Sequence, residues 1–309
     1  MIRIDGLVKR YNKADRNAVD GISFEVGAGE FFALLGPNGA GKTTTISILT
    51  TTLTPTGGTA TIDGSDVIRE ASAVRRIVGI IFQRPSLDMN LTAEENVRFH
   101  AILYGLYPYA PTYGLMPAAY REQVSQLASL LGIADDIRKP MRTFSGGMRR
   151  KLEIVRSLMH RPKVLFLDEP TAGLDVPSRR TLWDYLRTIR RESGTTIFLT
   201  THYLEEAEEA DTICIIDQGK VVSFGTPQRI KSELVQEYVL VDADDRARLR
   251  EELARLEIRS EGDGPFRLHV DSRRAHAALK AIDTPLTLVR THAPTLEDAY
   301  LQIVAKPSE

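Results

Sequence analysis

A glycine-rich turn followed by a lysine and three threonines offers the most specific chemistry in the chain. It fits the pattern G-x-x-x-x-G-K-[ST], in which glycines let successive backbone N–H groups converge on a phosphate. Lys42 would bridge the β- and γ-phosphates of a nucleotide, and the Thr43 hydroxyl would ligate Mg²⁺. A dinucleotide-binding G-x-G-x-x-G turn is excluded, because its glycines stand in a different register and no Lys-Thr pair follows them. The residues of the turn are Gly36, Pro37, Asn38, Gly39, Ala40, Gly41, Lys42, Thr43 and Thr44.

Two adjacent acids, Asp168 and Glu169, follow an apolar run that ends at Leu167. One acid in this position could hold the water shell of Mg²⁺, and the other could polarise an attacking water as a general base. Taken alone, the pair could equally cap a helix or face solvent. Because a phosphate-binding turn precedes them, we predict that Asp168 is a magnesium ligand and that Glu169 is the general base.

Parallel strands would carry these groups to one edge of a sheet. Continuous apolar runs predict buried strands, and 3.6-residue periodicity predicts the helices between them. Alternation of strand, helix and strand implies a parallel sheet. Strands are predicted at 31–35, 164–167, 196–200 and 212–217, helices at 44–53 and 178–191, a mostly helical region at 85–161, and a hairpin turn at 217–220.

The stretch 143–151 resembles the signature sequence of ATP-binding cassette (ABC) proteins. Ser145, Gly146 and Gly147 match that pattern, whereas Met148 replaces the glutamine most common there. A Ser hydroxyl and glycine N–H groups at a helix start would form a second anion site. The simpler alternative is that Ser145 only caps the helix.

Four single residues resemble further members of the family's composite site. Gln83 resembles the glutamine that contacts Mg²⁺ and senses the γ-phosphate, and His202 the histidine that contacts the γ-phosphate and orders the attacking water. Asp175 resembles the residue that links the two sites of a dimer. Tyr11 stands where the family stacks an aromatic ring on adenine, although it could also pack locally at a strand end.

The resemblance implies ATP and Mg²⁺ as ligands and a two-fold dimer as the working unit. In the family's head-to-tail arrangement, each ATP lies between the Lys42 turn of one subunit and the Ser145 turn of the other. The partner would be a second copy or a pseudo-symmetric relative, and one chain alone should be nearly inactive.

Longer stretches resemble the daunorubicin-resistance type of bacterial exporter ATPase. This resemblance implies export of drugs, lipids, polysaccharides or ions through a separate membrane permease. The segment 107–117 departs from the type as an aromatic, proline-rich insertion that is unlikely to be helical. It could adapt the subunit to its permease or be a tolerated surface insertion. The resembling stretches are 83–88, 91–96, 103–106, 201–207 and 294–301.

The expected fold is α/β, a P-loop NTPase of the ABC cassette type with a mixed sheet core, an antiparallel β subdomain and a helical lobe at about 85–161. This ATPase domain is expected to span residues 1–233. Residues 234–309 read as a small α+β accessory domain of the ferredoxin-like βαββαβ order, provided that 257–260 supplies a weak second strand.

Composition and net charge limit the partners and the cellular location that can be expected for this chain. The formal net charge of −1 gives no global attraction to nucleic acid, so no nucleic-acid partner is expected. The single cysteine, Cys214, suits a reducing compartment, and no apolar window is long enough for a membrane span. The chain is therefore expected in the cytoplasm, peripheral on the inner face of the membrane through its permease. An importer ATPase, or a soluble ABC ATPase acting on ribosomes or DNA, remains as an alternative.

Overall fold

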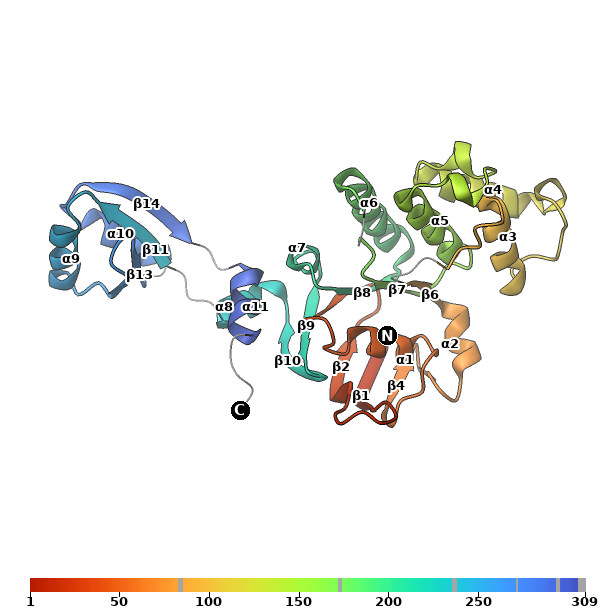
Figure 1. Ribbon diagram of the computed structural model, residues 1–309, viewed down its shortest axis with the longest axis horizontal. Helices are drawn as coiled ribbons and strands as arrows, with labels where there is room; N and C mark the ends of the chain where they lie inside the picture. Colours follow the sequence, from red (N-terminus) through yellow and green to blue (C-terminus); the bar gives the residue numbers. More distant parts are fainter. Residues whose placement is uncertain (83–85, 172–173, 235–237, 271, 293–294, 305–309) are drawn as a thin grey trace. The chain divides into compact units, whose positions relative to one another are not determined.

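Figure 1 shows the computed structural model of the chain, which describes residues 1–82, 86–171, 174–234, 238–270, 272–292 and 295–304. Contacts between residues divide the chain into two compact units, Met1–Gly225 and Thr226–Glu309. Every candidate site residue belongs to the first unit. Of these candidates, Gln83 lies outside the described residues.

A six-stranded sheet forms the centre of the first unit, in the order β10-β9-β3-β8-β7-β6. The strands from β9 to β6 pair in parallel and only β10 is antiparallel, which confirms the predicted parallel sheet and hairpin. The central strands are buried throughout, as expected of strands covered on both faces. Their bounds are β3 (Phe31–Leu35), β6 (Val78–Ile81), β7 (Val164–Asp168), β8 (Thr196–Thr201), β9 (Thr212–Asp217) and β10 (Lys220–Gly225).

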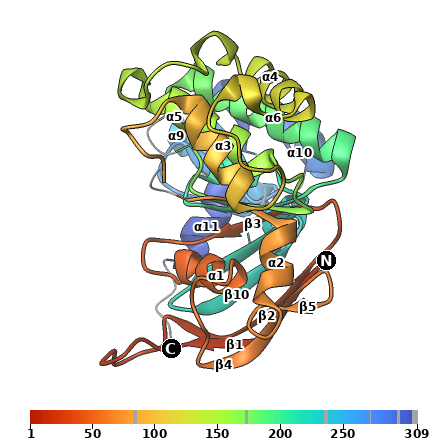
Figure 2. The ribbon, with the colours of Figure 1, turned by 90° about the vertical axis from the view of Figure 1, so that its right-hand side faces the viewer.

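An antiparallel sheet of order β2-β1-β4-β5 lies on one side of the six-stranded sheet (Figures 1 and 2). Buried and open residues alternate along β2, because one face of this sheet packs on the core. Phe24 of β2 stacks on Phe32 of β3 with ring centroids 5.1 Å apart, so the two sheets share a core. The bounds are β1 (Ile2–Lys9), β2 (Val19–Val26), β4 (Gly57–Ile62) and β5 (Ser65–Asp66), with helices α1 (Lys42–Leu49) and α2 (Ala71–Ile77).

A helical lobe lies on the other side of the six-stranded sheet (Figure 2). Its first helix begins with a capping box, in which the Thr92 hydroxyl accepts from the Glu95 N–H and the Glu95 carboxylate accepts from the Thr92 N–H. Only Tyr113–Leu115 of the 107–117 insertion forms a short 3-10 turn, so the insertion is largely non-helical, as predicted. The helices on this side are α3 (Ala93–Leu103), α4 (Ala118–Leu130), α5 (Gly146–Leu158), α6 (Val176–Ser193) and α7 (Leu204–Ala207), with 3-10 turns η1 (Tyr113–Leu115), η2 (Ala134–Asp136) and η3 (Met141–Thr143).

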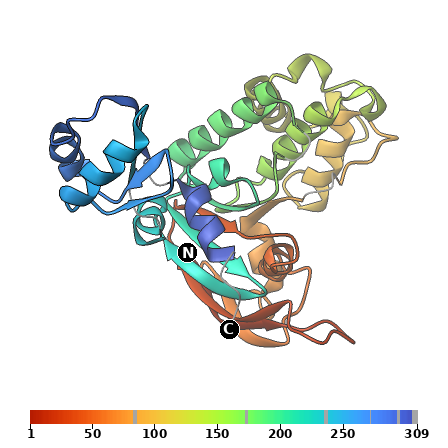
Figure 3. The same ribbon diagram turned by 60° about the vertical axis from the view of Figure 1, so that its left-hand side comes forward.

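The second unit contains a four-stranded antiparallel sheet of order β12-β13-β11-β14, which Figure 3 brings forward. This is the ferredoxin-like order. Apolar residues of α9 and α10 pack on the same sheet face, where Val241 and Phe266 are buried. The elements are α8 (Pro227–Leu234), β11 (Tyr238–Ala243), α9 (Arg246–Arg255), β12 (Ser260–Glu261), β13 (Phe266–Leu268), α10 (Ser272–Lys280), β14 (Leu286–His292) and α11 (Leu296–Val304).

The division between the units falls earlier than the boundary expected near Glu233. It lies between Gly225 and Thr226, because helix α8 packs against α11 of the second unit. Ile230 of α8 and Leu296 of α11 are both buried. Among the described residues, no helix combines the length and the apolar character needed to cross a bilayer.

Candidate active site

The glycine-rich turn joins β3 to α1 and approaches its neighbours too closely for side chains. A Cβ atom on Gly36 would lie 2.3 Å from the carbonyl oxygen of Ile216, and one on Gly41 would lie 2.4 Å from that of Ala18. Gly41 also has a φ of +107°, a conformation that favours glycine. The turn therefore has the tight backbone path and the following helix N-terminus that favour phosphate binding.

Lys42 is buried beneath this turn, with only 5% of the residue exposed. Its Nζ donates to the carbonyl oxygens of Gly36, at 2.7 Å, and Pro37, at 3.1 Å. The same nitrogen lies 4.0 Å from Oε1 of Glu169. Burial lowers the pKa of Lys42, while the nearby carboxylates of Glu169 and Asp168 oppose that shift. The ammonium group is thus held between the turn and the two acids.

Asp168 ends strand β7 and is almost fully buried. Its Oδ1 accepts a hydrogen bond of 2.5 Å from the hydroxyl of Thr200, its register partner on β8. Burial raises the pKa of Asp168 and Glu169 adds to the rise, whereas Thr200, Lys42 and a hydrogen bond from Thr43 act against it. The carboxylate and the Thr43 hydroxyl therefore adjoin.

These two groups fit Mg²⁺ in kind and in number. Mg²⁺ prefers hard oxygen ligands and is usually held by one or two protein groups together with substrate phosphates and waters. Asp168 and Thr43 supply one carboxylate and one hydroxyl. In the described part of the chain, no cluster of three or more acidic, His or Cys side chains could hold a metal.

Glu169 follows Asp168 in an unusual backbone conformation, with a φ of +47°. A non-glycine residue in the left-handed region is strained and is often found at functional sites. The N–H of Glu169 donates to the carbonyl of Thr200, and its Oε1 lies 3.1 Å from Nδ1 of His202. This contact brings together the predicted general base and the histidine that the sequence analysis assigned by resemblance.

A buried carboxylate that the sequence analysis left without a role lies close enough to His202 for the two charges to interact. Glu206 of α7 accepts hydrogen bonds from the hydroxyls of Thr171 and Thr201, and the Thr201 hydroxyl in turn accepts from the N–H of Tyr203. Burial raises the pKa of Glu206, while these threonines act against the rise. The acidic run after His202 was visible in the sequence, but its burial was not.

Tyr11 lies beside the phosphate-binding turn, with its hydroxyl 3.2 Å from that of Thr44. Lys9 is placed over its ring, with Nζ 5.7 Å from the centroid. Almost half of Tyr11 is exposed, so the side chain is open to a stacking partner.

Ser145 and Asp175 form a second group at the N-termini of α5 and α6. The Ser145 hydroxyl accepts from the Met148 N–H, and the Asp175 carboxylate accepts from the Ser178 N–H, so each residue caps its helix. The two helix starts adjoin, because a Cβ on Gly147 would lie 3.1 Å from Oγ of Ser178. Gly146 lies beside Ser145 with open space around its Cα. The structure therefore contains the helix-capping hydrogen bond of Ser145 that the simpler alternative predicted.

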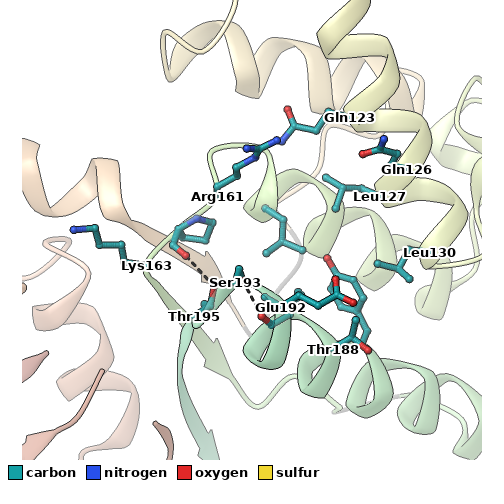
Figure 4. Close-up of a pocket in the computed structure, with 14 residues that line it drawn as sticks. Gln123, Gln126, Leu127, Leu130, Arg161, Lys163, Thr188, Glu192, Ser193 and Thr195 are labelled. Atoms are coloured by element: carbon teal, nitrogen blue, oxygen red, sulfur yellow. Dashed lines mark hydrogen bonds between the residues drawn. The ribbon is translucent and has the colours of Figure 1, made fainter. Parts of the chain in front are cut away.

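A pocket of about 460 Å³ lies elsewhere in the first unit, between α4 and α6 (Figure 4). It reaches Lys163 and Thr195, which directly precede β7 and β8, whereas Asp168 and Glu169 lie at the other end of β7. None of the candidate site residues lines it. The assignment of the nucleotide site therefore rests on the turn and the acids. The lining residues are Gln123, Gln126, Leu127, Leu130, Leu158, Arg161, Pro162, Lys163, Tyr185, Thr188, Ile189, Glu192, Ser193 and Thr195.

Comparison with known proteins agrees with this geometry. Residues 19–172 match the ABC transporter family. The chain is 39% identical to the daunorubicin/doxorubicin resistance ATP-binding protein DrrA of Streptomyces peucetius, over all of this chain and 93% of that protein. It is 36% identical to the Nod factor export ATP-binding protein I of Paraburkholderia xenovorans, over 99% of this chain and 97% of that one.

Solved structures give the same result. An ATP-binding subunit of an ABC transporter superposes with a TM-score of 0.66 and 29% identity, over 75% of this chain and 92% of that one. The cassette MJ0796, in a dimeric post-hydrolysis state with ADP and Pi, gives a TM-score of 0.66 and 25% identity, over 73% and 98%. The chain therefore belongs to the ABC transporter family and is one of its ATP-binding, ATP-hydrolysing subunits.

Proposed function

We propose that the chain powers an exporter by hydrolysing ATP beneath a separate membrane permease. The observation that carries this proposal is the convergence of Lys42, Asp168, Glu169 and His202 at the carboxyl ends of β3, β7 and β8. The names of the relatives, which refer to drug resistance and Nod factor export, favour export over import. The subunit would work at the inner face of the membrane, attached through the permease.

Each side chain has a distinct part in the proposed reaction. Lys42 leaves the carbonyls of its own turn to bind the β- and γ-phosphates, and Tyr11 stacks on the adenine. Glu169 accepts the proton of the attacking water, and His202 holds the Glu169 carboxylate and contacts the γ-phosphate. Thr43, Asp168 and Gln83 would hold Mg²⁺, which neutralises charge on the phosphate oxygens when it is bound.

The site becomes complete only in a dimer. Ser145, Gly146 and Gly147 at the start of α5 would bind the γ-phosphate of the ATP on the other subunit, and Asp175 would link the two sites. ATP closes the dimer, water attacks the γ-phosphate in line, and release of products opens the dimer again. The helical lobe passes this motion to the permease.

Glu169→Gln tests the proposed reaction. The amide cannot accept the water's proton, so hydrolysis should fall by about a hundredfold or more, while ATP still binds and a closed dimer accumulates. Size-exclusion chromatography with light scattering, with and without ATP, measures the dimer, and phosphate release measures turnover. Turnover at the normal rate would exclude Glu169 as the base.

The 107–117 insertion supplies the test of the permease contact. Tyr109 and Leu115 are 70% and 69% exposed, whereas Ala110 and Met116 are buried in the lobe. Replacing Tyr109 and Leu115 by Ser should weaken co-purification with the permease and leave thermal unfolding unchanged. A matched pair of exposed apolar residues, Ile68 and Val222, provides the control. Equal permease binding by both double variants would contradict a docking role for the insertion.

A further inference from the structure

A buried arginine on the signature helix α5 bonds to two separate segments of the active site. Arg150 is only 6% exposed, and its guanidinium donates to the carbonyl of Pro170 at 2.9 Å, of Phe82 at 2.5 Å and of Asp168 at 3.4 Å. Asp168 and Pro170 flank Glu169, and Phe82 directly precedes Gln83. One side chain thus holds the general base segment and the start of the Gln83 segment to the same helix.

An acid on the next turn of α5 makes this burial possible. Glu153 is 1% exposed, and its Oε2 accepts from Nη1 of Arg150 at 3.0 Å. A buried charge is costly unless it is paired and hydrogen-bonded, and here each of the three guanidinium nitrogens donates to a carbonyl or to the carboxylate. The two residues therefore act as one buried unit.

The same pair also reaches the far side of Gln83. Oε1 of Glu153 accepts from the N–H of Ser86 at 2.9 Å, and Arg156 donates to the carbonyl of Ser86 at 2.6 Å. Phe82 and Ser86 are the nearest described residues on either side of Gln83. Helix α5 consequently holds both flanks of that segment.

We propose that the Arg150–Glu153 pair is a positioning unit that couples the two ATP half-sites of each subunit. The inference rests on the proposed dimer, in which Ser145 at the start of α5 serves the partner's ATP. A phosphate bound at Ser145 shifts α5, and Arg150 transmits the shift to Asp168, Pro170 and Phe82, which position the subunit's own ATP site. Binding at one site thereby favours assembly of the other.

A positive charge alone would not provide this coupling, because the coupling needs the geometry of an arginine side chain. Its planar guanidinium donates from Nε, Nη1 and Nη2 in three fixed directions, whereas a lysine ammonium is a compact group on a flexible stem. Arg150→Lys would keep the ion pair with Glu153 but could not hold all three carbonyls at once. A purely structural ion pair would tolerate this change; a coupling device would not.

The helical lobe contains a matched control. Arg98 of α3 is 3% exposed, pairs with Glu94 at 3.1 Å and donates to the carbonyl of Ala110 at 2.8 Å. It joins α3 to the insertion. Among the described residues, its hydrogen bonds and ion pairs reach Glu94, Glu95 and Ala110, and none of these is a candidate site residue. Arg98→Lys therefore removes a comparable buried guanidinium without touching the proposed coupling.

The experiment uses the full chain carrying Glu169→Gln, so that ATP-dependent dimers accumulate. Arg150→Lys or Arg98→Lys is added, and the fraction of dimer is followed by light scattering as ATP is raised. Affinity of the monomer for ATP is measured separately with a fluorescent analogue, and thermal unfolding is recorded for each variant. Arg150→Lys should raise the ATP concentration for half-maximal dimer by about tenfold, with unaltered monomer affinity, whereas Arg98→Lys should not.

The outcomes separate the inference from its premise. If the two arginine variants dimerise alike, the coupling role of Arg150 is wrong although the dimer stands. If the Glu169→Gln parent forms no dimer with ATP, the proposed function fails and the inference fails with it. Should Arg150→Lys fold poorly, Glu153→Gln gives the second reading: the same shift of the dimer midpoint supports the coupling, and no shift overturns it.

Discussion

At the scale of single residues, Thr200 of β8 holds both acids of the active site: its hydroxyl donates to Asp168, and its carbonyl accepts from the N–H of Glu169. The fixed spacing of the turn and of the acids was enough to propose them as site residues. Thr200 can bond to Asp168 because β7 and β8 pair in a register that places the two residues side by side. That register cannot be read from the sequence. The left-handed conformation of Glu169, whose N–H bonds to the Thr200 carbonyl, likewise has no signal in the sequence.

The contact between His202 and Glu169 leads to a prediction on turnover. His202→Ala should lower kcat by about a hundredfold, because the carboxylate loses the group that orients it, while the KM for ATP changes by less than about threefold. Steady-state phosphate release at a protein concentration that favours dimers measures both constants. His276, which is exposed in the second unit, gives the control variant His276→Ala. A large rise in KM with normal kcat would instead assign His202 to ATP binding.

At the scale of elements, buried strands were the most predictable part of the fold. The strand predicted at 212–217 is β9 (Thr212–Asp217), because a strand covered on both faces is a continuous apolar run. The weak second strand expected at 257–260 lies later in the chain, as β12 (Ser260–Glu261), and overlaps the predicted range only at Ser260. Its position depends on pairing with β13 at the edge of the sheet, and two residues carry no periodicity of their own.

Helix α9 gives a prediction on pH. Glu252 accepts from the N–H of Asp283, the N–H of Thr284 and the Thr284 hydroxyl, and these bonds lower its pKa to about 2. Because the folded pKa lies below the ordinary glutamate value of about 4.3, the bonds stabilise the second unit fully above that value. Their contribution is lost as the pH falls through about 2.

Hydrogen exchange followed by mass spectrometry checks this prediction in the full chain. Protection of the segment around Thr284 should fall between about pH 4.3 and pH 2, after correction for the intrinsic exchange rate. In Glu252→Gln, protection should already be lower at neutral pH and should change less with acid. Glu251→Gln, on the exposed neighbour, should behave as the parent chain. An unchanged acid response in Glu252→Gln would show that another group titrates.

At the scale of the whole molecule, the chain consists of two units with separate cores. The first unit corresponds to the cassette that the sequence motifs predicted. The end of that unit was harder to predict, because α8 has an amphipathic pattern that suits either neighbour. Only its packing against α11 assigns it to the second unit.

This division predicts how the chain can be shortened. A chain that ends at Gly225 should unfold cooperatively and bind ATP as the full chain does, because its core is complete. A chain that ends at Glu233 adds α8 without α11, which exposes the apolar surface around Ile230. It should bind a hydrophobic dye more strongly and aggregate sooner on heating. Identical behaviour of the two shortened chains would mean that α8 is stable without α11.

The 107–117 insertion is anchored to the lobe on its inner side. Arg98 donates to the carbonyl of Ala110, and the rings of Tyr107 and Tyr113 meet Tyr120 edge-on. Tyr120, which is fully buried, bonds in turn to the Glu94 carboxylate. Deletion of the whole segment would therefore remove the residues that contact Arg98 and Tyr120, which are both buried.

During the evolution of this subunit, the exposed residues of the segment should therefore change more freely than its length. Substitutions at the exposed positions, such as Tyr109 and Leu115, should cost the fold little, so they can accumulate without loss of stability. Changes in the length of the segment disturb Arg98 and Tyr120 and should be purged. The length of the segment is therefore expected to persist even where its outer surface changes.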